Sequence, residues 1–486
     1  MKIIKTRKIF VNGKFEEGKI AIVVNDKIED IVPVSDAELF KNFAEYFEFE
    51  DGILLPGFID THTHMMGYGI NSVNSLEDTT SWEEAAERIR NTLNNQDLEV
   101  YIFTEFDESR WKEGKLPTRE DLDKISKKKP IFLRRVCGHI GVGNTPFLNL
   151  ILSRSQFDFS KISEVDGIFL EDVPLHINNL FPPSMELLNK AFDLAQERFI
   201  KEGITTISEI GGLRNFKFLQ KKWKDGELKI RVRYYVEGVE PDILILAGVE
   251  SGLGDDFFKF MGVKYFADGS VGGESAYFSF PYGERKKQGL FLLPDNFESI
   301  LKKYFENNIQ VAVHAIGNLA IKKLIEIAER IKTPELLRIE HCEFPDRDDI
   351  PRIARRKIKV SMQPNFAGNW GMEMGLYHKK LGDFYRFNNP INTFIKEGVW
   401  YAFGSDAMPP SPLFGIKSAI NHPIQEERID IEEAISRYTE YGAYLTFDEG
   451  DIGKIAHGYK ADFVVMDEKL EKVKAVFING RKVYNG

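Results

Sequence analysis

Two histidines, His62 and His64, close the short apolar stretch PGFIDTHTH that begins at Pro56. In a β-strand, residues two apart point to the same face, so both imidazoles can hold one metal ion while Thr63 points away. Imidazole nitrogen suits Zn²⁺ and other divalent transition metals. We expect Asp60 to orient one of these histidines rather than to bind the ion itself. The spacing therefore predicts part of a metal site.

Three further residues, all of types that commonly bind metal ions, each lie at the end of another apolar stretch. His314 lies in VAVHAIG, His341 in RIEHCEF and Asp406 in YAFGSD. Taken singly, each histidine is ordinarily a satisfied core residue, and the aspartate is ordinarily a helix cap. Taken together with the first pair, they would be costly to desolvate without a common cation. We therefore predict a divalent-metal site, with Asp406 also accepting a proton from the attacking water and passing it to the leaving group.

Two residues compete for a further ligand position. Lys264 lies in GVKYFADG, a predicted inner strand, where a buried ammonium group is strongly penalised. Once carbamylated by CO₂, this lysine becomes an anion that can bridge two metal ions; the ordinary alternative is pairing with Asp268. Glu171, in GIFLEDV, is a competing carboxylate ligand. The residues alone leave this choice open.

Strands that alternate with helical patterns have to position these residues, as in a parallel sheet with crossover helices. The candidate strands are residues 57–64, 203–210, 231–237, 262–269, 309–317, 337–344, 358–364 and 399–406. Eight strands are the number in a closed (β/α)₈ barrel, whose reactive groups come from the C-terminal strand ends. The four histidines and Asp406 all lie at such ends. The pattern predicts an α/β fold with a distorted TIM-type barrel over residues 56–449.

The sequence pattern at both chain ends predicts a second, smaller domain. Residues 1–55 and 450–486 are rich in alternating strands, with Asn-Gly turns at positions 12–13 and 479–480. We expect the two ends to pair into one composite β-sandwich that encloses the barrel as an inserted domain.

An insertion is predicted at about residues 72–185, after the first barrel strand, because usual connections span only about 2–6 residues. It contains DESRW, with Arg110 and Trp111, and RRVCGHIGVGN, with His139. We predict that these three side chains contribute to substrate binding.

The composition narrows the class of partner. The chain has 486 residues, a formal net charge of −10, 43% hydrophobic and 29% charged residues. Such a mixed, acidic surface argues against a nucleic-acid or anionic-membrane partner and favours a small-molecule substrate. With only two cysteines and no apolar run suited to a signal peptide or a membrane span, we expect a cytoplasmic protein. A homo-oligomer is left open.

Several ordered blocks match one known family. They include PGFIDTHTH, FDESRW, FLRRVCGHIGVGN, GIFLED, VKYFADGSVGGESAYF, HAIGN, RIEHCE, FGSDAMPPSP and GKIAHGYKADFVVMD. Over nearly its whole length the chain resembles the amidohydrolase superfamily of metal-dependent hydrolases, and within it the N-substituted formamide deformylase-like branch. The resemblance implies a distorted (β/α)₈ barrel with a β-sandwich built from both chain ends.

The resemblance also implies roles for single residues. It implies metal ligation by His62, His64, His314, His341 and Asp406, with Asp406 as the proton shuttle. By strand position, Lys264 matches the lysine that is carbamylated in many binuclear relatives, and in this branch the glutamate at Glu171 takes that bridging part instead. Relatives often carry an acidic residue at Asn318 and a His-Asp pair at Ser208-Glu209, so we expect substrate choice to differ.

The sequence thus predicts a metal-dependent hydrolase of C–N bonds other than peptide bonds, acting on an amide or formamide through a metal-activated water. Zn²⁺, as one or two ions, is the expected metal. A deaminase or cyclic amidase of the same superfamily is the first alternative. The second, from another class, is a catalytically silent metal-binding protein.

Overall fold

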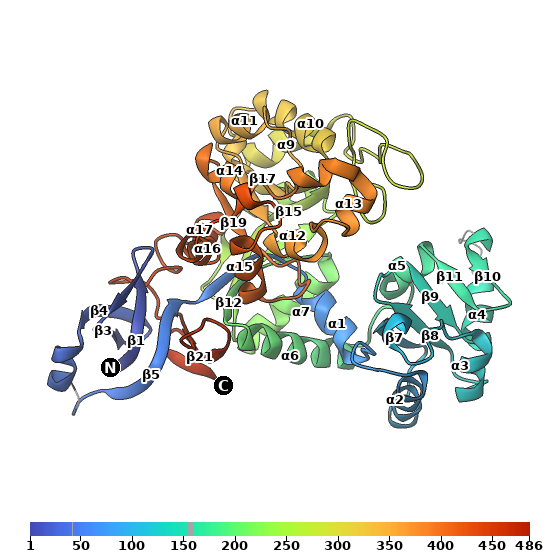
Figure 1. The fold of residues 1–486 in the computed structure, drawn as a ribbon, viewed down its shortest axis with the longest axis horizontal. Coiled ribbons are helices and arrows are strands. Elements are labelled where there is room, and N and C mark those ends of the chain that lie inside the picture. Colours follow the sequence, from blue (N-terminus) through green and yellow to red (C-terminus); the bar gives the residue numbers. More distant parts are fainter. Residues whose placement is uncertain (41, 154–158) are drawn as a thin grey trace. The chain divides into compact units, whose positions relative to one another are not determined.

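The computed structural model describes residues 1–40, 42–153 and 159–486, and these form two compact units (Figure 1). The larger unit consists of Met1–His64 and Gln196–Gly486, and the smaller unit of Met65–Ala195. Within the described residues, no helix is both long enough and apolar enough to cross a membrane.

A parallel sheet forms the centre of the larger unit. Its strands, in spatial order, are β6 (Phe58–Thr63), β12 (Ile204–Gly211), β13 (Arg231–Glu237), β15 (Phe258–Phe266), β16 (Gln310–Ala315), β17 (Leu337–His341), β18 (Lys359–Met362) and β19 (Tyr401–Phe403), and β14 (Leu253–Gly254) pairs with β15. Every predicted barrel strand is confirmed, in the predicted order. Spatial order follows chain order because crossover helices connect neighbouring parallel strands.

The sheet nearly closes into a barrel between its first and last strands. Across this seam the Asp406 amide donates to the His62 carbonyl at 2.7 Å, and the Thr61 hydroxyl donates to the Phe403 carbonyl at 2.9 Å. Gly404 permits the close approach, because a Cβ atom there would lie 2.5 Å from the His62 amide nitrogen. The seam therefore brings the first metal-binding motif next to the last.

Helices cover the outside of this barrel. They are α7 (Leu213–Lys224), α8 (Pro241–Leu246), α9 (Phe297–Glu306), α10 (Asn318–Glu329), α11 (Ile350–Arg355), α12 (Pro364–Trp370), α13 (Leu376–Leu381), α14 (Ile391–Lys396), α15 (Pro412–Ile420), α16 (Ile431–Arg437) and α17 (Glu440–Leu445). The helix α6 (Met185–Lys201) begins in the smaller unit and ends in the larger one. In α10, Ile321, Leu324, Ile325 and Ala328 are buried, at the three- and four-residue spacing of a helix with one apolar face.

A second sheet in the same unit joins the two chain ends (Figure 1). Its order is β22 (Arg481–Asn485), β21 (Val473–Ile478), β20 (Phe463–Met466), β5 (Glu45–Pro56), β1 (Lys2–Val11), β3 (Lys19–Val24) and β4 (Lys27–Pro33), with β2 (Lys14–Glu17) on β1. Asn12 and Gly13, like Asn479 and Gly480, have positive φ, as the Asn-Gly turns require. The two ends pair as predicted; their arrangement as a two-layered sandwich stays a prediction.

The smaller unit contains its own sheet. In the described residues its order is β10 (Ile162–Ser163), β11 (Ile168–Leu170), β9 (Ile140–Gly143), β8 (Ile131–Arg135) and β7 (Tyr101–Phe106). Its helices are α1 (Met65–Val73), α2 (Trp82–Asn95), α3 (Arg119–Ile125), α4 (Thr145–Leu152) and α5 (Asp172–Leu180). Phe132, Phe147 and Phe169 pack against one another in its core. The predicted insertion falls inside this unit.

Candidate metal centre

Three side chains converge at the C-terminal end of the barrel. One ligand atom from each of His62, His64 and Asp406 lies within 4.8 Å of the others. The Asp406 carboxylate is 3.2 Å from His64 Nε2 and 3.5 Å from His62 Nε2. His62 and His64 come from one strand end, and Asp406 reaches them across the barrel seam. Two imidazoles and a carboxylate at this spacing are a suitable donor set for a divalent transition metal.

His62 is held from behind by a buried ion pair. Its Nδ1 lies 2.5 Å from Glu340 Oε2, and Glu340 Oε1 lies 2.6 Å from Arg338 Nε. Burial would raise the pKa of Glu340, but the Arg338 charge and the His62 hydrogen bond lower it to about 2. Burial lowers the pKa of His62 to about 4. The neutral ring therefore donates Nδ1–H to Glu340 and presents Nε2 to the site.

His64 is held by a backbone group instead. Its Nδ1 lies 3.0 Å from the Ile210 carbonyl oxygen. Burial alone would lower the pKa of His64, but the hydrogen bond and charge of Asp406 raise it to about 9. The pKa of Asp406 falls to about 2, because His62 and His64 outweigh the effect of burial. Without a metal, His64 and Asp406 thus form an imidazolium–carboxylate pair.

The other two predicted histidines pack beside this cluster. The ring centroid of His341 lies 4.7 Å from that of His62 and 4.5 Å from that of His314. His341 Nδ1 is 2.7 Å from Gln363 Oε1, and His314 Nε2 is 3.1 Å from the Gly269 carbonyl. Burial lowers the pKa of both rings, that of His314 to about 3. The structure therefore groups all four imidazoles, of which His62 and His64 place a ligand atom within the tight cluster with Asp406.

Asp60 acts on the backbone rather than on a histidine ring. Its carboxylate accepts from the Ser405 amide at 2.9 Å, from the Ser405 hydroxyl at 2.5 Å and from the His62 amide at 3.2 Å. It thereby fixes the two strand ends on either side of the seam, and it supports His62 through the backbone amide rather than through the ring.

Lys264 is buried on β15. Burial lowers its pKa, against the opposing effect of Glu340 and Asp406. Its Nζ lies 5.1 Å from the ring centroid of Phe266. A lowered pKa increases the share of free amine, the form that reacts with CO₂.

A model of the amidohydrolase family matches residues 49–484. The chain belongs to the amidohydrolase family. That membership places it among the metal-dependent hydrolases, in agreement with the clustered donors.

Individual relatives cover most of this amidohydrolase. The Bacillus subtilis protein YtcJ is 28% identical over 91% of the chain and 90% of its own length. The N-substituted formamide deformylase of Arthrobacter pascens is 20% identical over 87% of the chain and 85% of its own length. An uncharacterized metal-dependent hydrolase from Pyrococcus furiosus has the same fold, with a TM-score of 0.81 and 24% identity over 96% of this chain and 98% of that one.

The remaining predicted residues of this amidohydrolase belong to the smaller unit. Glu171 Oε2 lies 2.9 Å from His139 Nδ1, and both side chains are partly exposed. Arg110 donates to the Glu77 carbonyl at 3.0 Å. Trp111 is buried in the core of this unit and donates its indole N–H to Thr79 at 3.0 Å. Their roles toward substrate or metal stay predictions.

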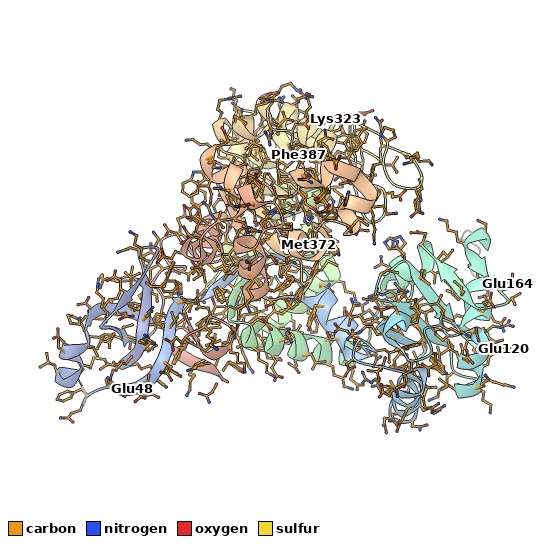
Figure 2. All side chains as sticks on the ribbon, viewed as in Figure 1. Glu48, Glu120, Glu164, Lys323, Met372 and Phe387 are labelled. Atoms are coloured by element: carbon orange, nitrogen blue, oxygen red, sulfur yellow. The ribbon has the colours of Figure 1, made fainter. Side chains whose placement is uncertain are left out.

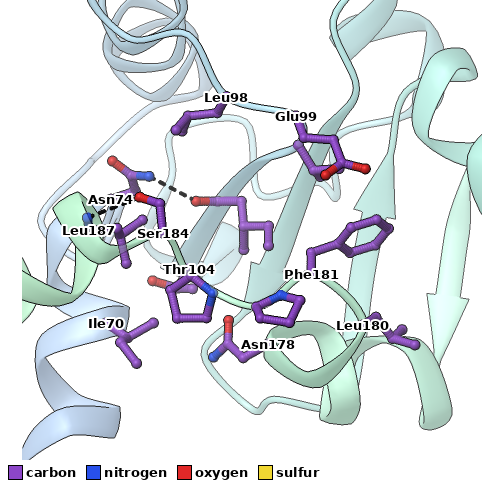
Figure 3. A pocket seen from close by; sticks show the side chains of 14 residues that line it. Ile70, Asn74, Leu98, Glu99, Thr104, Asn178, Leu180, Phe181, Ser184 and Leu187 are labelled. Atoms are coloured by element: carbon purple, nitrogen blue, oxygen red, sulfur yellow. Dashed lines mark hydrogen bonds between the residues drawn. The ribbon is translucent and has the colours of Figure 1, made fainter. Parts of the chain in front are cut away.

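The smaller unit also contains a cavity of about 240 Å³ (Figure 3). Its wall includes Ile70, Thr104, Asn178 and Phe181, and Asn74 donates to the Ile102 carbonyl at its edge. Among its described lining residues there is no histidine, and Glu99 is the one carboxylate. The cavity therefore lacks the donors of the metal centre.

Sequence reasoning missed the residues that support the histidines of this amidohydrolase. Arg338 and Glu340 share the inward face of β17, and Gln363 directly follows β18. The signal was the two-residue alternation in RIEH, which places a charged pair inside the barrel. Buried charges in a barrel strand need partners, and here Glu340 finds one in His62.

Proposed function

We propose that this protein hydrolyses C–N bonds other than peptide bonds in small molecules of the amide or formamide type. The convergence of His62, His64 and Asp406 at one barrel mouth carries this proposal. The distant similarity to an N-substituted formamide deformylase supports a substrate of that type and a place in that branch.

Zn²⁺ is the metal we propose. The donors are neutral imidazole nitrogen and carboxylate oxygen, a combination that zinc accepts in catalytic sites. The Nδ1 atoms of His62 and His64 are each occupied by a protein oxygen, which leaves each Nε2 for the ion. His314 and His341 would hold a second ion, with Lys264, carbamylated, or Glu171 as the bridging ligand.

Held by these residues, a zinc ion would supply a water of lowered pKa and a Lewis acid for the scissile carbonyl. Protein side chains transfer the proton and hold the reacting groups in place. Asp406, ionised because of the neighbouring imidazoles, accepts the proton of the attacking water and delivers it to the leaving amine. Glu340 keeps the tautomer of His62 fixed throughout, because its carboxylate only accepts hydrogen bonds. His139, Arg110 and Trp111 remain proposed contributors to substrate binding, with the buried Trp111 acting through the smaller unit's core rather than by direct contact.

The test is a screen of zinc-loaded protein against matched N-formyl and N-acyl amines, with metal-stripped protein as the control. We expect formate or carboxylate to be released together with a primary amine, and no turnover after chelation. Release of ammonia from aminated rings, with no amide cleavage, would instead assign a deaminase. Full zinc loading without turnover of any amide, ester or imine would overturn the enzymatic proposal.

A further inference from the structure

The cavity of the smaller unit shares no residue with the metal centre. Its volume is about 240 Å³, and its described lining residues all lie between Ile70 and Leu187, within that unit. Helix α1, strand β7 and the segment between α5 and α6 contribute to its wall (Figure 3). This volume suits a ligand smaller than a typical drug molecule, because pockets for drug-sized ligands begin at about 300 Å³.

Most of the cavity wall is apolar. Ile70, Val100 and Leu187 line it, together with the Phe181 ring. The residues at positions 182 and 183 are both prolines, and because proline has no backbone N–H, this side of the wall offers carbonyl oxygens but no donor. A ligand of this cavity therefore needs an apolar body.

The polar groups of the cavity mostly accept hydrogen bonds. Asn74 donates through Nδ2 to the Ile102 carbonyl at 3.1 Å, which leaves its Oδ1 as an acceptor. The Thr104 hydroxyl already donates to the Asn71 carbonyl at 2.6 Å, so its oxygen can only accept from a ligand. The Asn178 amide has no hydrogen-bond partner among the described residues. A ligand head that donates several hydrogen bonds fits these groups.

The charge of the lining narrows the ligand further. The described lining contains no lysine, arginine or histidine, so an anion would find no cationic partner there. Glu99 is its one charged residue; it is exposed and forms no ion pair within the described part of the chain. A carboxylate without a partner at the edge of an apolar cavity attracts a cation.

We propose that this cavity binds a primary alkylammonium ion, with the alkyl chain against the apolar wall and the charged head on the acceptors. An ammonium group has three donors and no acceptor, which matches the polar groups of the wall. Burial of the chain supplies most of the binding free energy, and Glu99 selects for the charge. Such an amine is also what hydrolysis of an N-alkyl amide releases. A product-sensing role would therefore rest on the proposed function, whereas the binding itself does not.

The experiment titrates the zinc-loaded full chain with n-hexylamine and follows the methyl signals of ¹³C-labelled isoleucines by NMR. Ile70 and Ile102 line the cavity, whereas Ile210, whose carbonyl contacts His64 Nδ1, reports on the metal centre. We expect the Ile70 and Ile102 signals to shift with one saturable affinity that is the same in the zinc-free chain. Affinity should fall about fourfold for each methylene removed from the amine. Hexanoate should leave both signals unshifted.

Two variants test the site itself. Ile70→Trp fills the cavity and should abolish the Ile102 shift. Glu99→Gln, a change on the surface, serves as the second variant should Ile70→Trp fail to fold. It should weaken the binding of n-hexylamine about two- to fivefold. The binding of uncharged n-hexanol should not change.

Glu164→Gln is the matched control. Glu164 is an exposed carboxylate of the same unit that does not line the cavity (Figure 2). Its variant should bind n-hexylamine as the wild type does. Equal losses in the Glu99 and Glu164 variants, equal affinities for n-hexylamine and hexanoate, or shifts confined to Ile210 would overturn the inference. None of these readouts needs turnover, so a zinc-loaded protein that binds the amine at Ile70 but hydrolyses no amide would contradict the proposed function alone.

Discussion

Glu340 lies 2.5 Å from Nδ1 of His62, and in the described residues no other imidazole of the centre has a carboxylate on its Nδ1. His64 and His341 use a carbonyl and an amide oxygen there. A carboxylate partner makes the imidazole a stronger electron donor and fixes its orientation. His62 is therefore the best-supported of the proposed ligands.

The first prediction follows from that contact. Glu340→Gln removes the charge facing His62 and leaves Arg338 without its carboxylate, so zinc affinity should fall about 10- to 100-fold. Competition with a chromogenic chelator measures the change, and the d–d spectrum of the Co²⁺-loaded variant should shift as well.

Glu343→Gln is the control for that experiment. Glu343 is also buried, but it accepts a hydrogen bond from Tyr377 at 2.6 Å rather than from a histidine. Burial raises its pKa to about 8, so the neutral amide mimics the form that prevails at pH 7. Equal losses of zinc affinity in both variants would show that any buried carboxylate has the same effect.

Zinc affinity should depend on pH through His64. Its pKa is raised to about 9 in the zinc-free pair with Asp406, so below that pH a proton must leave before the ion binds. We expect the apparent affinity to rise with pH, by up to about tenfold per unit between pH 6 and 9, and then to level off. Titrations in competition with a chelator test this. A flat profile would contradict the His64–Asp406 pair.

Asp406→Asn should abolish most turnover without unfolding the protein. The amide cannot accept the proton of the attacking water, and the loss should be about 10²- to 10⁴-fold in kcat. Circular dichroism and the melting temperature should match those of the wild type. Near-normal kcat on an amide found in the screen would rule out the proton-transfer role.

Lys264→Ala distinguishes the two bridging candidates. If carbamylated Lys264 bridges two ions, the variant should bind one zinc ion per chain instead of two, as measured by elemental analysis. Glu171→Ala, prepared in parallel, should then keep both. If instead Glu171→Ala binds one zinc ion per chain and Lys264→Ala binds two, the bridging ligand is Glu171.

Lys359 should make stability depend on pH in the larger unit. Burial lowers its pKa from the usual 10.5 to about 7, although its Nζ lies 3.7 Å from the Phe447 ring centroid. Between these values the unfolded chain binds more protons, so stability rises with pH from about 7 to 10.5. Below pH 7 both states are protonated and the full cost of burying the charge remains.

Lys359→Met removes that cost. The variant should be more stable than the wild type, most clearly at pH 7 and below, with the gain shrinking toward pH 10. Chemical denaturation at several pH values measures it. The exposed Lys469→Met serves as the control and should show no such trend; a constant difference across pH for Lys359→Met would contradict the assignment.

The barrel could be predicted from sequence because its strands are apolar, short and separated by helical patterns. Likewise, the two-residue spacing of His62 and His64 indicates two imidazoles on one face of a strand, where they can hold one metal ion. The contacts of Glu340 with His62 and of Asp60 with Ser405 were harder to predict. These partners lie about 280 and 345 positions apart in the sequence, and no local pattern identifies them. Local periodicity predicts which face a side chain takes, whereas the partner on that face depends on the closed fold.

The seam between β6 and β19 has a consequence for how the protein is made. His62 leaves the ribosome early and Asp406 late, and the carboxylate meets the imidazoles only when the two edges of the barrel join. A partly synthesised chain holds the paired histidines but lacks this acidic donor. With the proposed ligand set, tight metal binding and hydrolytic activity therefore arise only in the last stage of biosynthesis.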